Sequence, residues 1–381
     1  MPRPPASSRP RERQKAPPKA LADGPCSFYA AVPPGLEPVV VRELALHGVE
    51  GQVEPGGVRF QGPLRLARLA GELWTPSRLQ VEVATGHARS LEELAALTRK
   101  AEWRAFLPPG ARVEVEASCS GSRLHFREAI ERKVAFAVQD AAGRPRERDA
   151  RVQPVRVRLV EDLATLSVDA GGELLHRRGW RLQPGRAPIR ETIASALLFM
   201  AGWQADEVLL DPLCGSGTIP IEAARRAAGM RPGEGRSYAF EGWPALRGLS
   251  LAGPKPGGAR PAPATATIYG SDRDPGAIAA AQDNAARARV KPRWSRIDLA
   301  ELEAPAPSGL VLTNPPWGER VGDEARALDV LGQALRGPLS GWRALFLVPD
   351  AGLALRVDRR ARCLTTFQSG GLRIGAFVVE P

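Results

Sequence analysis

Two short stretches of the chain combine residue types that can do chemistry, and each follows an apolar run. The first, Asp211–Thr218, contains Gly215 and Gly217 on either side of one serine. The second, Asn314–Trp317, reads Asn-Pro-Pro-Trp. Glycines at a strand end let the backbone approach a ligand, and prolines hold the neighbouring backbone rigid. The two motifs therefore indicate a cofactor site beside a binding place for a flat ring that carries an amine.

The residues after the apolar run Thr267–Tyr269 extend the first motif. Asp272 stands at that strand end, where a carboxylate can accept both hydroxyl hydrogens of a ribose. Asp274 precedes Pro275 and is expected to cap the following helix, which leaves Asp272 to the ligand. Asp298 follows a third short strand and is a candidate acceptor for an adenine amino group, with a simple turn role as the alternative.

The spacing of these residues argues against a dinucleotide. Such a site would need a third glycine and an acid about 20 residues further on, and the acid here comes much later. This favours S-adenosylmethionine, which has no pyrophosphate. The expected cofactor-binding residues are Asp211, Cys214, Gly215, Ser216, Gly217, Thr218, Asp272, Asp298 and Asn314.

The second motif supplies the expected catalytic residues, Asn314, Pro315, Pro316 and Trp317. The Asn314 side-chain oxygen and the Pro315 carbonyl can accept the two hydrogens of one NH₂ group, which favours a pyramidal nitrogen aimed at a methyl donor. This is catalysis by positioning. Trp317 offers a face on which a base can stack, and a paired base must leave its helix to reach it. Glu319 and Arg320 either contact the substrate or form a surface ion pair.

The elements that position these motifs follow from apolar runs that alternate with helical patterns. Continuous runs suit strands buried on both faces, so an α/β fold with a mostly parallel, doubly wound sheet is predicted. The runs are Val208–Leu210, Thr267–Tyr269, Leu310–Leu312, Ala344–Val348 and Ile374–Val379. Residues 229–264 hold 8 glycines and 6 prolines and are predicted to form an inserted loop.

The part of the chain before these runs has a different pattern. Short strands and helices, such as the helical spacing of Leu36–His47 and the alternating run Ala111–Ala117, predict α+β units. Residues 1–24 form a basic, proline-rich tail that is expected to be disordered. An Arg- and Gly-rich linker, 173–188, separates the α+β part from the sheet domain, 189–381.

Composition narrows the partners. The 381 residues carry a net charge of +11, and the pI is about 10.2, which favours nucleic acid; an arginine-rich proteome is the alternative. Four scattered cysteines without a Cys-x-x-Cys pair indicate reduced thiols in a cytoplasm and no metal site. The longest apolar stretch, Ile193–Trp203, is too short for a membrane span, and the N-terminus lacks the apolar core of a secretory signal.

These motifs resemble a known family. Residues 189–381 are similar to class I S-adenosylmethionine-dependent methyltransferases with an Asn-Pro-Pro-aromatic signature. Together with Arg177–Trp180, Ala187–Thr192 and Asn314–Arg320, they look like the branch of bacterial 23S rRNA guanine-N2 methyltransferases that carry a THUMP domain. The resemblance implies a Rossmann-like seven-stranded sheet, preceded by a ferredoxin-like segment at 25–68 and an RNA-binding THUMP domain at 69–172.

The resemblance also implies an activity. It is methyl transfer from S-adenosylmethionine to the N2 amine of a guanine, most simply in 23S rRNA or a pre-50S particle, by a cytoplasmic monomer engaged in rRNA processing. The alternatives are a tRNA guanine-N2 or adenine-N6 methyltransferase, a non-catalytic RNA-binding ribosome-assembly factor, and a small-molecule methyltransferase. Three departures stand out: Trp317 replaces the usual tyrosine, residues 229–264 are unusually rich in glycine and proline, and the second methyltransferase activity of some relatives is not expected here.

Overall fold

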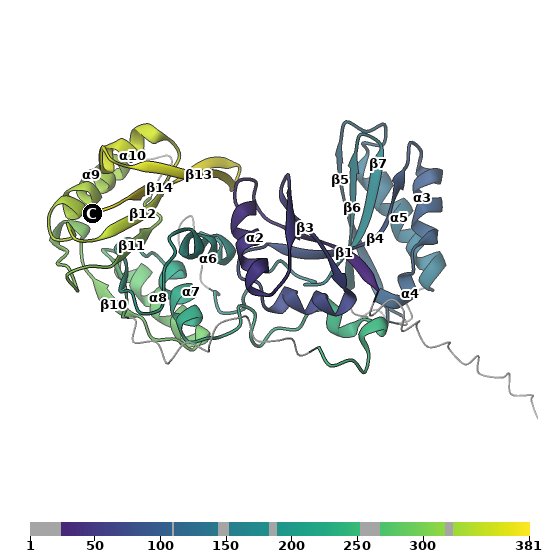
Figure 1. Cartoon of the computed structure of the whole chain (residues 1–381), viewed down its shortest axis with the longest axis horizontal. Coiled ribbons are helices and arrows are strands. Elements are labelled where there is room, and N and C mark those ends of the chain that lie inside the picture. Colours follow the sequence, from purple (N-terminus) through teal and green to yellow (C-terminus); the bar gives the residue numbers. More distant parts are fainter. Residues whose placement is uncertain (1–23, 109, 144–151, 183–188, 252–266, 317–322) are drawn as a thin grey trace, which may run out of the picture.

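The computed structural model describes residues 24–108, 110–143, 152–182, 189–251, 267–316 and 323–381 (Figure 1). Two seven-stranded sheets lie side by side along the long axis, with the N-terminal sheet at one end and the C-terminal sheet at the other. None of the helices within these ranges is long and apolar enough to cross a bilayer.

The N-terminal sheet has the order β2-β3-β1-β4-β7-β6-β5. Its strands are β1 (Pro25–Ala31), β2 (Gly51–Glu54), β3 (Gly57–Pro63), β4 (Arg78–His87), β5 (Arg112–Ser120), β6 (Val152–Val160) and β7 (Leu163–Asp169). Only β5 and β6 run parallel to each other among these pairs. β4 pairs with β1 on one side and with β7 on the other, so one sheet includes strands from both expected N-terminal domains, 25–68 and 69–172. The boundary between these two domains at residue 68 stays a prediction.

Helices cover this sheet. They are α2 (Glu37–Leu46), the 3₁₀ helix η1 (Leu64–Gly71), α3 (Leu91–Lys100), α4 (Trp103–Phe106) and α5 (Arg127–Ala142). The helical run from Leu91 is broken at Ala101, whose backbone is extended. The break lets Trp103 turn into the core, where it is 1% exposed and its indole N–H donates to the Thr98 carbonyl at 2.6 Å.

The C-terminal sheet has the order β10-β9-β8-β11-β12-β14-β13. Its strands are β8 (Leu209–Asp211), β9 (Ile268–Asp272), β10 (Arg293–Arg296), β11 (Leu310–Thr313), β12 (Arg343–Val348), β13 (Arg362–Ser369) and β14 (Leu372–Val379). The five strands from β10 to β12 are parallel, and β14 and β13 are antiparallel to their neighbours. The predicted mostly parallel seven-stranded sheet is therefore confirmed.

Helices flank this second sheet, as expected for strands buried on both faces. They are α6 (Glu191–Met200), α7 (Thr218–Ala227), α8 (Pro275–Ala288), α9 (Asp323–Arg336) and α10 (Ala351–Val357). β13 lacks a continuous apolar run, because it is an edge strand in which only Phe367 is buried, and it was not among the predicted strands. The described part of the predicted insert contains two 3₁₀ turns, η2 (Ala239–Gly242) and η3 (Pro244–Leu246).

A buried carboxylate organises the junction between α2 and the chain ahead of β4. Glu43 is 1% exposed and accepts hydrogen bonds from the Trp74 N–H at 2.6 Å, the Thr75 N–H at 3.1 Å and the Thr75 hydroxyl. A buried backbone N–H left without an acceptor carries a desolvation penalty.

Replacing this carboxylate tests its structural role. Glu43→Ala should lower the free energy of unfolding by about 2–4 kcal/mol, because two buried N–H groups lose their acceptor. Urea unfolding followed by circular dichroism measures the change, and exposed Glu50→Ala is the matched control. Equal midpoints for the two variants would contradict this account.

Candidate active site

The ends of β8 and β11 are joined by a buried hydrogen bond. The Thr313 hydroxyl donates to Asp211 Oδ1 at 2.7 Å, and the Leu213 N–H donates to the same oxygen at 3.2 Å. Both Thr313 and Asp211 are buried. Burial raises the pKa of Asp211 to about 7, although the two hydrogen bonds act to lower it. The first and second sequence motifs therefore start from neighbouring, physically linked strand ends.

The two glycines of the loop serve different purposes. Both have positive φ, +51° at Gly215 and +83° at Gly217. A Cβ at Gly217 would lie 2.6 Å from the Trp294 ring and 2.9 Å from the Ala281 Cβ, whereas a Cβ at Gly215 would meet no atom of the described residues within 4 Å. Gly217 therefore admits the packing of a tryptophan, while Gly215 borders open space that a ligand can occupy.

Asp272 lies at the end of β9 and faces the glycine loop. Its Oδ2 accepts the Gly215 N–H at 3.0 Å, and its Oδ1 accepts the Asp274 N–H at 2.9 Å. Asp274 caps α8 by accepting the Gly276 N–H at 2.8 Å, with Pro275 in the first turn. The predicted assignment of Asp274 to the helix is confirmed, and the Asp272 carboxylate is held in a fixed orientation beside the loop.

The remaining loop residues are buried and mostly held by backbone contacts. The Cys214 N–H donates to the Ser271 carbonyl at 3.0 Å, and burial raises the pKa of the Cys214 thiol well above its usual value, so the thiol stays protonated. The Ser216 carbonyl accepts the Asn284 side-chain amide at 3.1 Å. Asp298 is exposed, and its Oδ1 caps a 3₁₀ turn by accepting the Ala300 N–H at 3.0 Å.

The second motif begins directly after the buried Thr313. Asn314 is half-buried, Pro315 is buried and Pro316 is exposed. Trp317, Glu319 and Arg320 lie outside the described residues. The strand pairing of β11 with β8 brings Asn314 and the glycine loop to the same edge of the sheet, where parallel α/β sheets bind their ligands.

An ion pair that the sequence analysis missed lies at the start of α7. Arg181 Nη2 contacts Glu191 Oε2 at 2.6 Å, and Arg181 Nη1 donates to the Ile189 carbonyl at 2.9 Å and to the Thr218 hydroxyl at 3.4 Å. Burial raises the pKa of Glu191 to about 7, and Arg181 opposes the shift. The pair ties the linker and α6 to the last residue of the glycine motif. The sequence signal that could have indicated this pair is Glu191, an acidic residue in the first turn of an otherwise apolar helix.

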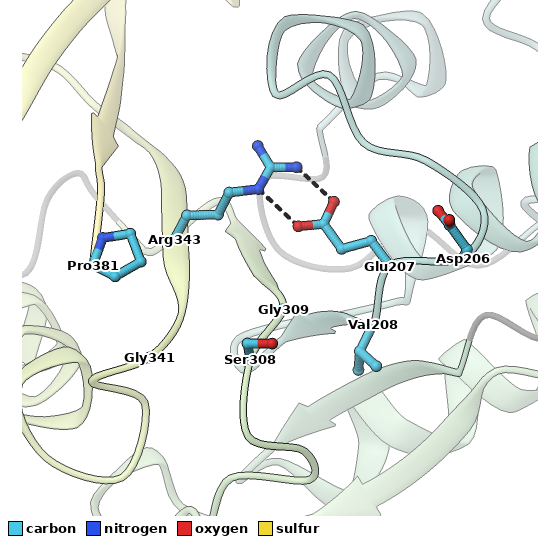
Figure 2. A pocket seen from close by; sticks show the side chains of 8 residues that line it. All are labelled: Asp206, Glu207, Val208, Ser308, Gly309, Gly341, Arg343 and Pro381. Carbon is cyan, nitrogen blue, oxygen red and sulfur yellow. Dashed lines mark hydrogen bonds and ion pairs between the residues drawn. The ribbon is translucent and has the colours of Figure 1, made fainter.

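A hollow of about 300 Å³ lies at the opposite edge of the sheet (Figure 2). Its lining comes from the residues before β8, β11 and β12, from Arg343 at the start of β12 and from Pro381. Arg343 forms a two-point ion pair with Glu207 at 2.7 and 2.5 Å. Because it faces the amino ends of the parallel strands, this hollow is not the cofactor site. Among the described residues, no three His, Cys, Asp or Glu side chains gather closely enough to hold a metal.

Substituting each glycine separates the two roles. Gly217→Ala should destabilise the protein by about 3 kcal/mol or more, because a positive φ and a clash with Trp294 add together. Gly215→Ala should cost only about 1–2 kcal/mol, from the positive φ alone. Thermal unfolding of the two variants measures the difference. A larger loss for Gly215→Ala would show that the packing around Gly217 is misassigned.

The raised pKa of Asp211 has a consequence for stability. Between about pH 4 and pH 7 the folded protein keeps a proton on Asp211 that the unfolded chain has released. The stability contributed by Asp211 therefore falls as pH rises through this window and is constant above it. Asp211→Asn should remove this fall, on the order of 4 kcal/mol. Urea unfolding of the wild type and of Asp211→Asn at several pH values measures this fall. Glu191 titrates in both proteins, so its contribution cancels in the difference between their stability curves. Parallel stability curves would contradict the shift.

Comparisons with known proteins agree with this fold. Three family models match the chain: the RMKL-like methyltransferase domain at residues 178–341, the RlmL ferredoxin-like domain at 27–70 and the THUMP domain at 88–169. The crystal structure of SMU.472 complexed with SAH aligns with a TM-score of 0.80 and 26% identity, over 93% of this chain and 98% of that one.

Two curated relatives span almost all of this chain. A protein of Synechocystis sp. named "Putative RNA methyltransferase slr0064" is 32% identical, over 91% of this chain and 94% of the relative. A ribosomal RNA large subunit methyltransferase K/L of Syntrophotalea carbinolica is 35% identical over 92% of this chain, which spans 53% of that relative. The chain therefore belongs to the S-adenosylmethionine-dependent RNA methyltransferases that join a ferredoxin-like and a THUMP domain to an RMKL-like methyltransferase domain.

Proposed function

We propose that the protein transfers the methyl group of S-adenosylmethionine to the exocyclic N2 amine of a guanine in 23S rRNA, in the cytoplasm, on free RNA or a pre-50S particle. The observation that carries this proposal is the 2.7 Å hydrogen bond between Thr313 and Asp211. Because Asn314 follows Thr313 directly, this bond supports a site in which the Asn-Pro-Pro motif and the glycine loop act on one reaction centre.

The cofactor fits the residues of the glycine loop and strand ends. Each carboxylate oxygen of Asp272 accepts one backbone N–H and keeps a lone pair for a ribose hydroxyl. The open space beside Gly215 admits the ligand against the backbone. When bound, S-adenosylmethionine supplies an electrophilic methyl group on a sulfonium. The further residues proposed to line this place are Asp211, Cys214, Ser216, Gly217, Thr218 and Asp298.

The chemistry assigned to the second motif is the positioning of a weak nucleophile. The lone pair of a guanine N2 amine is delocalised into the ring. The Asn314 side-chain oxygen and the Pro315 carbonyl accept its two hydrogens, and Pro316 keeps this turn rigid. Trp317 is proposed as the stacking surface for the base. Holding both hydrogens directs the nitrogen lone pair toward the methyl carbon.

An exposed aromatic corner in the THUMP domain supports RNA as the substrate. Phe126 is 71% exposed at the start of α5, and the centroids of the His125 and Phe126 rings are 4.2 Å apart. Arg123 and Arg127 are exposed on either side in sequence. Exposed rings stack on unpaired bases, and arginines neutralise phosphates. We assign this corner to single-stranded RNA.

The choice of target base rests on the family resemblance and on the K/L relatives, of which this chain spans about half. Adenine N6 is also an exocyclic ring amine and suits the same pair of acceptors, and tRNA is an alternative carrier. A non-catalytic assembly factor would not require the fixed Asp272 carboxylate or the open space beside Gly215.

Removing the acceptor on Asn314 tests the proposed activity. Asn314→Ala should lower tritium transfer from labelled S-adenosylmethionine to unmodified rRNA by about 100-fold or more, because the amine loses its orientation. Because Asn314 is also an expected cofactor-binding residue, calorimetry should show a cofactor Kd weakened by no more than about tenfold, a much smaller effect than the loss of transfer. Gln333→Ala, which removes an exposed amide from the same domain, is the matched control.

The base is identified by the same assay. Digested product RNA should contain labelled N2-methylguanosine, separated from N6-methyladenosine by liquid chromatography and mass spectrometry. N6-methyladenosine as the labelled nucleoside would move the target to adenine. Transfer to no RNA by a protein that binds the cofactor would leave the assembly-factor hypothesis.

A further inference from the structure

One segment of the methyltransferase domain leaves that domain and packs against the THUMP domain. It is Arg231–Leu251, the described residues that follow α7, and it is called the brace below. In Figure 1 it runs beneath the N-terminal half as far as α4. Its glycine and proline content predicted a loop, yet its aromatic residues are buried: Tyr238, Phe240 and Trp243.

The root of the brace is fixed to α7, the helix that begins at the glycine loop. Arg225 on α7 is 3% exposed. Its guanidinium donates to the Arg231 carbonyl at 2.8 Å and to the Pro232 carbonyl at 3.2 Å. An arginine buried with carbonyl partners on the next segment sets the direction in which that segment leaves the helix.

The middle of the brace is held by the linker between the two halves. The Arg236 guanidinium donates to three carbonyls, of Leu174 at 3.1 Å, Arg177 at 3.0 Å and Glu173 at 3.2 Å. It also lies over the Tyr238 ring, 5.0 Å from the centroid. The planar fork of arginine suits such a cluster of acceptors, and a lysine ammonium cannot reproduce its geometry.

The far end of the brace inserts into the THUMP domain. Trp243 is 0% exposed, its indole N–H donates to the Gln153 side chain on β6 at 2.8 Å, and its ring makes an edge contact with Phe106 on α4 at 5.1 Å. The Phe240 N–H donates to the Ala170 carbonyl just after β7, at 3.1 Å. The far end is therefore buried against the THUMP domain.

A second set of contacts joins the halves elsewhere. The Thr365 hydroxyl on β13 donates to the Gly35 carbonyl at 2.9 Å. Buried Arg178 in the linker donates to the Trp74 carbonyl at 2.6 Å and lies 3.5 Å from Glu222 on α7. With the brace, these contacts hold the N-terminal half at several separate places, so hinge motion between the halves is opposed.

We propose that the brace sets a fixed distance and direction between the RNA-binding surface of the THUMP domain and the methyl-transfer site, and thereby decides which nucleotide of a docked RNA is methylated. This inference rests on the proposed function. An RNA bound by THUMP can present to Asn314 only a nucleotide at the distance that the braced halves allow. The brace residues Arg236 and Trp243 are positioning residues, since neither lies at the reaction centre.

The expected signature is a loss of turnover that depends on the length of the RNA. Arg236→Ala and Trp243→Phe should each lower kcat about tenfold on a structured rRNA fragment that spans both halves, because small misplacements of reacting groups slow reactions strongly. A short single-stranded oligonucleotide with the target base should react at the wild-type rate. KM for the rRNA fragment and the cofactor Kd should stay within about twofold.

The matched control is Arg247→Ala, which removes one positive charge from an exposed position of the same segment. It should behave as the wild type on both RNAs, so a general charge effect on RNA binding is separated from loss of the brace. Equal losses on the long and short RNA, unchanged rates on both, or a weakened cofactor Kd would each overturn the proposal.

A distance measurement separates failure of the brace from failure of the proposed function. Spin labels at Glu128→Cys on α5 and Gln282→Cys on α8, with Cys26, Cys119 and Cys363 changed to serine and buried Cys214 retained, report the spacing of the halves. Arg236→Ala should broaden the distance distribution and Arg247→Ala should not. If the wild type methylates no RNA, the proposed function fails, but the distance measurement still tests whether the brace fixes the two halves. Distance distributions of equal width in the wild type, Arg236→Ala and Arg247→Ala would overturn the proposal for the brace.

Discussion

The arrangement of the site depends on a hydroxyl–carboxylate hydrogen bond buried between two strand ends. Thr313 and Asp211 belong to β11 and β8, which are neighbours in the sheet but about a hundred residues apart in the chain. Asp211 begins the first motif, and Thr313 directly precedes the second. A buried carboxylate whose pKa is raised to about 7 carries a cost. The buried hydrogen bond fixes the distance between the cofactor loop and the base-binding loop, because satisfied polar interactions in a core specify a single arrangement.

Much of the methyltransferase domain could be predicted from sequence, because its strands are short, apolar and buried on both faces. The same reasoning failed at β13, where an edge strand has no continuous apolar run. It assigned Asp274 to the cap of α8 correctly, since Pro275 marks the first turn of that helix. Local signals of this kind need no knowledge of distant contacts.

The rest of the site depends on contacts that no local pattern records. Nothing in the spacing of Gly217 reveals that Trp294, from another strand, fills the place of its missing side chain. The Arg181–Glu191 pair joins the linker to α6, and no sequence pattern indicates that these two residues meet. Composition indicated a plain loop after α7. It could not indicate the burial of Trp243, because that burial depends on Phe106 and Gln153 of another domain.

The anchoring of Arg231 and Pro232 by Arg225 bears on how such enzymes can be recombined. The covalent boundary between the halves lies in the linker, but a large part of their shared interface is encoded within the methyltransferase sequence. A chimera joined at the linker would place Trp243 against a foreign THUMP domain that lacks the matching contacts of Phe106 and Gln153. Grafting the N-terminal half of one member onto another therefore requires transplanting residues 231–251 as well, so the unit of exchange is discontinuous in sequence.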